Sequence, residues 1–116
     1  MKKISENREP SINGIKSIIL DCIDKSGITV SQIILFGSRA RGDFGEDSDF
    51  DILIVIKDDI DLNQRKDLWE EVYKALHKNF PIISFDIFVK TAVDFEKERD
   101  VVNTVSNEAY TEGMKI

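Results

Sequence analysis

The sequence predicts a small α+β domain in which a mixed β-sheet is flanked by helices in two layers. The chain has 116 residues, which suits one compact domain with a hydrophobic core. Three short apolar runs, at 30–36, 50–56 and 82–89, have the length of strands. Segments with helical spacing of apolar residues precede, separate and follow these runs. This order of elements is typical of small α/β and α+β domains.

The first predicted helix follows a polar segment, 1–10, which we expect to be irregular. Ser11 is a favourable N-cap residue, and apolar residues recur behind it at helical spacing. Gly27 is expected to end this helix. We therefore divide the single domain, 1–116, into an N-terminal helical segment at 1–27 and a core at 28–116.

Around the first two predicted strands, residues 38–42 suit one helical turn with Ser38 as its cap, and residues 43–48 suit an acidic loop. The run 50–56 is dominated by Ile, Leu and Val, the pattern of a strand that is buried on both faces.

The second half of the chain is predicted to contain the longest helix, 62–78, which keeps an apolar face. On this face we expect Trp69 and Tyr73 to lie in the core. After the strand at 82–89 comes a helix over 92–110, interrupted near Lys97, and then a short turn or strand at 112–116.

Composition limits the partners that the chain can have. It contains 22 Asp and Glu against 16 Lys and Arg, which gives a net charge of -6 and argues against extended nucleic-acid binding. Cys22 is the only cysteine, so no intramolecular disulfide is possible. No apolar run reaches the length of a membrane helix. We expect a cytoplasmic protein that does not bind a membrane.

A Gly-Ser pair, Gly37 and Ser38, follows the first predicted strand. Glycine allows a phosphate to approach the backbone closely, and serine offers both its N–H and its hydroxyl. Arg39 and Arg41 add positive charge suited to triphosphate oxygens. A Gly-Ser pair alone is more typical of an ordinary strand-to-helix turn, so its meaning depends on the residues that follow.

Two acidic residues, Asp49 and Asp51, stand where the second strand begins. In an extended chain both side chains point to the same face. A solvated acidic loop is the simpler interpretation, but Asp51 leads directly into the apolar run, where an unpaired carboxylate is costly. A divalent cation with a preference for oxygen ligands, such as Mg²⁺, would relieve the repulsion between the two.

Asp86 is an acidic residue inside the third apolar run. An exposed acid, or one paired with an arginine, is an equally good interpretation of Asp86 alone. If its strand lies beside the second strand, Asp86 joins Asp49 and Asp51 in a three-carboxylate metal site. Three carboxylates beside a phosphate-binding turn predict two-metal phosphoryl or nucleotidyl transfer, in which Asp86 helps to take the acceptor proton.

The string from Phe36 to Gly42, followed by 47–51, resembles the signature of the DNA polymerase beta-like nucleotidyltransferase superfamily. It is most similar to the minimal nucleotidyltransferases of bacteria and archaea, and the resemblance covers about 28–116. It implies the palm-like nucleotidyltransferase fold of polymerase beta. It also implies metal binding by Asp49, Asp51 and Asp86, and triphosphate binding by the Gly-Ser pair.

The same resemblance implies a partner. Members of this branch, the MntA-type antitoxins, are encoded beside HEPN-type toxins that cleave RNA, and they transfer AMP from ATP to a toxin tyrosine. We therefore expect ATP as the substrate, Mg²⁺ as the cofactor and a HEPN-type toxin as the partner, within a homo- or hetero-oligomer. Two alternatives stay open: transfer to a small molecule such as an aminoglycoside, and an antitoxin that acts by steric binding with little catalysis.

Overall fold

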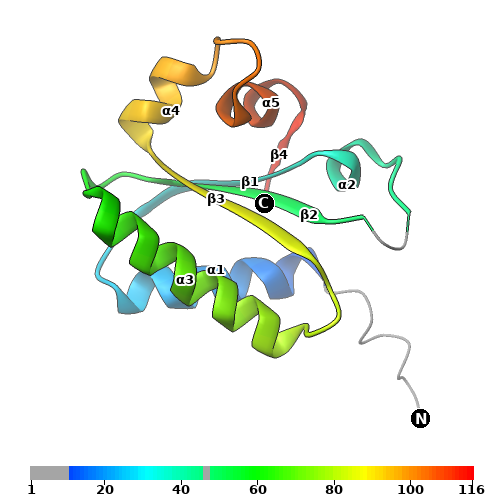
Figure 1. Ribbon diagram of the computed structural model, residues 1–116, viewed down its shortest axis with the longest axis horizontal. Coiled ribbons are helices and arrows are strands. Elements are labelled where there is room, and N and C mark those ends of the chain that lie inside the picture. Colours follow the sequence, from blue (N-terminus) through cyan, green and yellow to red (C-terminus); the bar gives the residue numbers. More distant parts are fainter. Residues whose placement is uncertain (1–10, 46–47) are drawn as a thin grey trace.

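A four-stranded mixed β-sheet lies between two pairs of helices (Figure 1). The computed structural model describes residues 11–45 and 48–116. The predicted irregular start, 1–10, and two residues of the acidic loop, Glu46 and Asp47, lie outside the described residues. In chain order the elements are α1 (Ile12–Lys25), β1 (Val30–Phe36), α2 (Ser38–Arg41), β2 (Phe50–Ile56), α3 (Leu62–Asn79), β3 (Phe85–Thr91), α4 (Ala92–Glu98), α5 (Val105–Glu112) and β4 (Met114–Lys115).

The strand β2 occupies an inner position in the sheet, whose order is β3-β2-β1-β4. It pairs in parallel with β3 and antiparallel with β1, and β4 adds a short antiparallel pair on the other side of β1. All residues of β2 except Asp51 are buried, so the predicted strand with two buried faces is confirmed. This topology brings the start of β2 beside the end of β1 and the start of β3.

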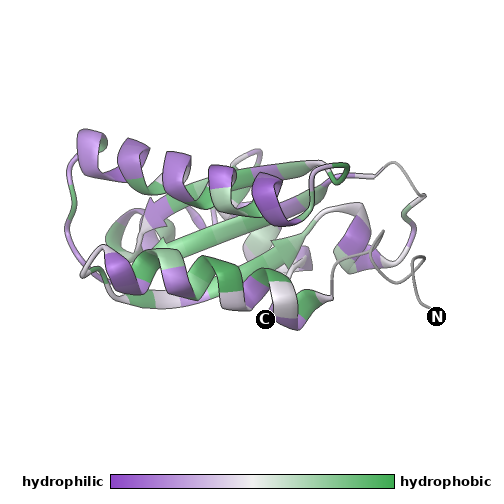
Figure 2. Cartoon of the chain, turned by 90° about the horizontal axis from the view of Figure 1, so that it is seen from below, coloured by the Kyte–Doolittle hydropathy of each residue, from purple (hydrophilic) through white to green (hydrophobic). Residues whose placement is uncertain are grey.

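The two faces of the sheet are covered by different helices. The larger core joins α1 and α3 to one face through residues such as Ile19, Ile54 and Leu76. A smaller core joins α4 and α5 to the other face through Phe95 and Ala109. Figure 2 shows the resulting pattern, with hydrophobic residues on the strands and polar residues on the outer sides of the helices. The mixed α+β fold is as predicted, and Cys22 is buried on α1.

The helix boundaries follow local sequence signals. The Ser11 hydroxyl accepts a hydrogen bond of 2.9 Å from the Gly14 N–H, and so caps α1. Gly27 follows the helix with a φ of 73°, a conformation that favours glycine. At α3, the Asp61 carboxylate accepts from the Gln64 N–H at 2.8 Å, and the Gln64 side chain accepts in return from the Asp61 N–H at 3.0 Å. This reciprocal pair is a capping box.

Three local predictions were wrong. The third strand begins at Phe85, because the chain from Phe80 to Ser84 forms a turn that leaves Ile82 exposed. Trp69 is not a core residue, since 36% of its surface is exposed and its indole N–H donates to the Ile87 carbonyl of β3. Tyr73 stacks on Trp69 and is only partly buried.

The other differences lie at helix ends. The predicted interruption of the helix over 92–110 is present, but it begins after Glu98 and extends to Thr104, which caps α5 by accepting from the Asn107 N–H at 3.0 Å. Ser38 does not cap α2; Gly37 holds that position without a side-chain hydrogen bond. Among the described residues, no helix is long and apolar enough to span a membrane.

We predict that Asp61→Ala lowers the free energy of unfolding by about 1 kcal/mol, because it removes the capping box of α3. Urea denaturation followed by circular dichroism measures this loss. Asp59→Ala is the matched control, since Asp59 is an exposed acid just before α3 with no hydrogen bond in the described part of the chain. An equal loss in both variants would contradict the assignment of the cap.

Candidate active site

The acidic residues meet where three strand ends come together. In the parallel register of β2 and β3, Asp51 lies directly beside Asp86. Both side chains occupy the sheet face that α4 and α5 cover further along, the face of Leu53 and Phe88. Asp86 is exposed and Asp51 is partly buried. The proximity of Asp86 to Asp51 therefore results from the strand register.

Asp49 stands just before β2 and is exposed. Burial, followed by the negative charges of Asp86 and Asp49, raises the pKa of the Asp51 carboxyl, which reaches about 6. The three carboxylates therefore act on one another electrostatically. We call this group of Asp49, Asp51 and Asp86 the acidic corner.

Gly37 follows β1 directly and lies against Asp51 of the acidic corner. Its φ is 76°, and a Cβ atom at this position would collide with the Asp51 carboxylate. Any larger residue would have to move both the turn and Asp51. The hydroxyl of the next residue, Ser38, makes no hydrogen bond with the rest of the described chain, so it is available to a ligand.

Arg39 is the buried arginine of the motif, with 7% of its surface exposed. Its guanidinium lies between two aromatic rings, 4.4 Å from the Phe44 centroid and 4.2 Å from the Phe50 centroid. It also donates two hydrogen bonds, of 3.2 and 3.1 Å, to the carbonyl of Ser48. Arg39 thus holds the loop that carries Asp49. Its predicted contact with a nucleotide stays a prediction.

Arg41 is exposed and lies at the end of α2. Its guanidinium makes ion pairs of 3.3 Å with Asp43 and with Glu112 of α5. The positive charge of Arg41 lowers the pKa of Asp51, so the side chain lies near the acidic corner. Because exposed ion pairs exchange readily, Arg41 can turn toward a triphosphate. It is the better placed of the two arginines for this role.

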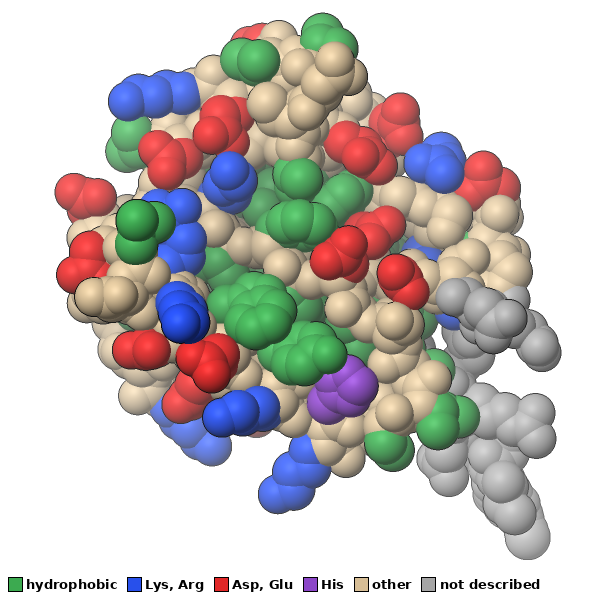
Figure 3. Space-filling view, in the orientation of Figure 1, with side chains coloured by type: hydrophobic (Ala, Val, Ile, Leu, Met, Phe, Trp, Pro, Cys, Tyr) green, Lys and Arg blue, Asp and Glu red, His purple; other side chains and the backbone are tan. Residues whose placement is uncertain are grey.

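Sequence reasoning missed Glu108 on α5. Its negative charge raises the pKa of Asp51 further, although the two residues are far apart in the chain. The predicted helix already contained Glu108, but only the packing of α5 against the sheet shows which of its acids faces the corner. Figure 3 shows acidic side chains gathered on this face, beside a hydrophobic patch and the single histidine.

A row of three rings lies along α3. Trp69 stacks on Tyr73 with centroids 5.0 Å apart and planes 9° from parallel, and Tyr73 contacts His77 at 4.6 Å. The row lies along β3, and the Ile87 carbonyl of this strand accepts a hydrogen bond from the Trp69 indole N–H.

The donor set of the acidic corner suits a hard divalent cation. Its ligands are carboxylate oxygens, which Mg²⁺ prefers. The pKa of Asp51 is raised by burial and by repulsion from the neighbouring carboxylates, and a cation would offset both. Within residues 11–45 and 48–116, no three His, Cys, Asp or Glu side chains are already arranged as a metal-binding group. The fit therefore rests on chemistry and register, and substrate phosphates would supply further oxygen ligands.

This combination of fold and site is that of the nucleotidyltransferases. The nucleotidyltransferase domain family matches residues 15–109, and the chain belongs to this family. The match begins at Ile15, inside α1, and ends at Ala109, inside α5.

A curated relative from Methanocaldococcus jannaschii carries the name "Putative protein adenylyltransferase MJ0141". The two chains are 35% identical over 77 residues, which cover 66% of this chain and 71% of the relative. The resemblance to the minimal nucleotidyltransferases is confirmed.

Solved structures share the fold. One is described as a toxin-antitoxin with AMP-PNP; it has a TM-score of 0.55, 21% identity, and coverage of 86% of this chain and 70% of that one. Another is a "putative nucleotidyltransferase" from Sulfolobus solfataricus, with a TM-score of 0.54, 24% identity, and coverage of 99% and 86%.

We predict that substitution of the two motif arginines has different effects on the free energy of unfolding. Arg39→Met should lower the free energy of unfolding by about 2 kcal/mol, because it removes a buried guanidinium from between two rings and from the Ser48 carbonyl. Arg41→Met should leave the unfolding transition close to that of the unmodified protein, since its ion pairs are exposed. Urea titrations of both variants test this, and equal destabilisation would contradict it.

We also predict a pH-dependent gain in stability from Asp51→Asn in protein treated with EDTA. A folded-state pKa of about 6, above the ordinary 3.8, means that the folded protein binds more protons than the unfolded chain between these values. Stability therefore falls as pH rises through this window, and Asn avoids the loss. Because Asp51 is partly solvated, we expect a gain of about 1 kcal/mol at pH 7.5.

The gain should shrink toward pH 4, where the folded-state Asp51 is protonated. Denaturant titrations at pH 4, 5.5 and 7.5 measure it, and Asp59→Asn controls for the loss of one negative charge. A gain of equal size at all three pH values would disprove the assignment.

Proposed function

We propose that this chain is a Mg²⁺-dependent protein adenylyltransferase that transfers AMP from ATP to a tyrosine hydroxyl of a HEPN-type toxin, and so acts as its antitoxin. The observation that carries the proposal is the register that sets Asp51 beside Asp86, with Gly37 in contact with Asp51. The name of the relative from M. jannaschii supports a protein as the acceptor. The toxin-antitoxin structure with AMP-PNP supports the partner and the nucleotide.

In the proposed reaction, the acceptor oxygen attacks the α-phosphorus of ATP. A new phosphorus–oxygen bond forms, the bond between the α-phosphorus and its bridging oxygen breaks, and pyrophosphate leaves with the electron pair. The proton of the acceptor hydroxyl passes to Asp86 or, through it, to water. Bound Mg²⁺ would supply charge neutralisation and a lower pKa for the acceptor hydroxyl.

Different residues of the chain would bind the triphosphate, the metal and the acceptor. Gly37 and Ser38 would hold the triphosphate beside the acidic corner, and Arg41 would neutralise part of its charge. Asp49 and Asp51 would hold the metal, and the exposed Asp86 faces the side from which an acceptor can approach. Most of the rate enhancement would come from placement and electrostatic stabilisation.

We predict that incubation with ATP, Mg²⁺ and the protein encoded next to this chain adds the mass of one or more adenylyl groups to that neighbour. Intact-mass spectrometry measures the change, and peptide mapping finds the modified residue. The double variant Asp49→Asn, Asp51→Asn should slow the transfer by more than about 100-fold, because it removes two metal ligands. Asp59→Asn, an exposed acid outside the site, should transfer at the normal rate.

Two results would overturn the proposal. If the double variant still neutralises the toxin fully, and no mass is added, the chain acts by steric binding. If the neighbour is unchanged while ATP is consumed with an aminoglycoside, the acceptor is a small molecule.

A further inference from the structure

A hollow of about 530 Å³ is lined by α5, by the turn that precedes it and by one residue of α2. We call it the α2–α5 hollow. Arg41 lines it from α2, and Asn107, Glu108 and Thr111 line it from α5. The ion pair between Arg41 and Glu112, of 3.3 Å, crosses from one helix to the other. The volume falls within the range of small-molecule sites.

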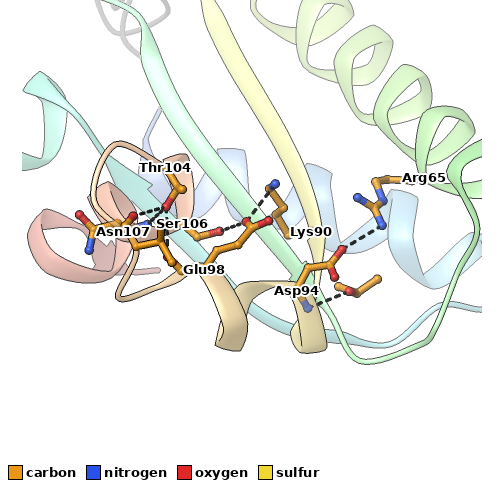
Figure 4. A network of polar contacts seen from close by, with 9 residues as sticks. Arg65, Lys90, Asp94, Glu98, Thr104, Ser106 and Asn107 are labelled. Carbon is orange, nitrogen blue, oxygen red and sulfur yellow. Dashed lines mark hydrogen bonds and ion pairs between the residues drawn. The ribbon is translucent and has the colours of Figure 1, made fainter.

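The α5 wall of the hollow is held by a network of polar contacts (Figure 4). The Thr104 hydroxyl donates to the Glu98 carbonyl at 3.1 Å, and the Asn107 amide donates to the Arg99 carbonyl at 2.7 Å. In the same turn of α5, the Ser106 hydroxyl donates to the Glu98 carboxylate at 2.9 Å. This carboxylate also pairs with Lys90 of β3 at 3.1 Å. The first turn of α5 is thus fixed to the sheet before any ligand binds.

Glu108 stands on this fixed wall with its carboxylate unused. It is exposed, and its carboxylate makes no hydrogen bond or ion pair with other residues of the described chain. The helix α5 packs on the sheet face that Asp51 occupies, and the charge of Glu108 acts on Asp51. The hollow therefore presents a hydrogen-bond acceptor beside the position proposed for the α-phosphate.

The chemistry of the hollow selects the uncharged part of a nucleotide. The carboxylates of Glu108 and Glu112 would repel phosphate oxygens, but they accept hydrogen bonds from hydroxyl groups. In a nucleoside triphosphate, the group that follows the α-phosphate is the ribose, with two hydroxyl donors. Acidic side chains that accept from ribose hydroxyls are an established solution in other nucleotide-binding folds.

We infer that the α2–α5 hollow binds the nucleoside of the substrate, and that Glu108 accepts hydrogen bonds from its ribose hydroxyls. This inference rests on the proposed nucleotidyl transfer and adds a residue that selects ribonucleotides over deoxyribonucleotides. The base extends past Glu108 toward Thr111 and the exposed Val102.

Titration calorimetry with Mg²⁺ and without any acceptor protein tests this inference. The ligands are ATP, 2′,3′-dideoxy-ATP and inorganic triphosphate. The unmodified chain should bind ATP about tenfold more tightly than dideoxy-ATP, the value of one hydrogen bond to a charged group. In Glu108→Ala, a helix-favouring change, this preference should fall below about twofold, while the affinity for inorganic triphosphate is not reduced.

Glu96→Ala is the control, because it removes the same charge from the exposed surface of α4; it should keep the preference for ATP. If Glu108→Ala keeps the preference, or weakens ATP and dideoxy-ATP equally, the inference is wrong while nucleotide binding stands. If inorganic triphosphate binds as tightly as ATP, the nucleoside adds no affinity and the hollow does not bind it. If the unmodified chain binds none of the three ligands, the proposed function fails as well.

Discussion

The pairing of Asp51 with Asp86 is the constraint on which the site depends. Two carboxylates placed side by side on adjacent strands repel each other, and burial of Asp51 adds to this cost. The fold tolerates the arrangement because the remainder of β2 is buried and pairs along its whole length with β1 and β3. The strongly packed centre of the sheet thus holds in place a corner that would not assemble by its own interactions.

The motif between β1 and β2 places its two arginines in different surroundings. Arg39 is enclosed by Phe44 and Phe50, so its charge stabilises the loop that leads to Asp49. Arg41, two residues later, is exposed and pairs with partners that it can leave. Two neighbouring residues of the same type therefore differ in role because α2 is a single helical turn that directs one inward and the other outward.

Much of the fold could be predicted because its signals are local. Apolar runs and helical spacing were sufficient for β1, β2 and α3, and the predicted helix cap at Ser11 is present. The start of β3 could not be predicted, since Ile82 is as apolar as a strand residue and its exposure depends on the turn at Phe80. The interruption between α4 and α5 was predicted, but its length depends on the hydrogen bonds of Thr104.

The candidate site shows the same division between local and long-range information. Gly37, Ser38, Asp49 and Asp51 lie in one continuous motif, so their proximity is a local property. Asp86 was found because a lone acid in an apolar run is conspicuous, whereas Glu108 is an ordinary residue of a polar helix face. Only the packing of α5 over the sheet brings it to Asp51. A family motif therefore identifies the reaction that a site performs, while the residues that select its substrates come from elements that the motif does not contain.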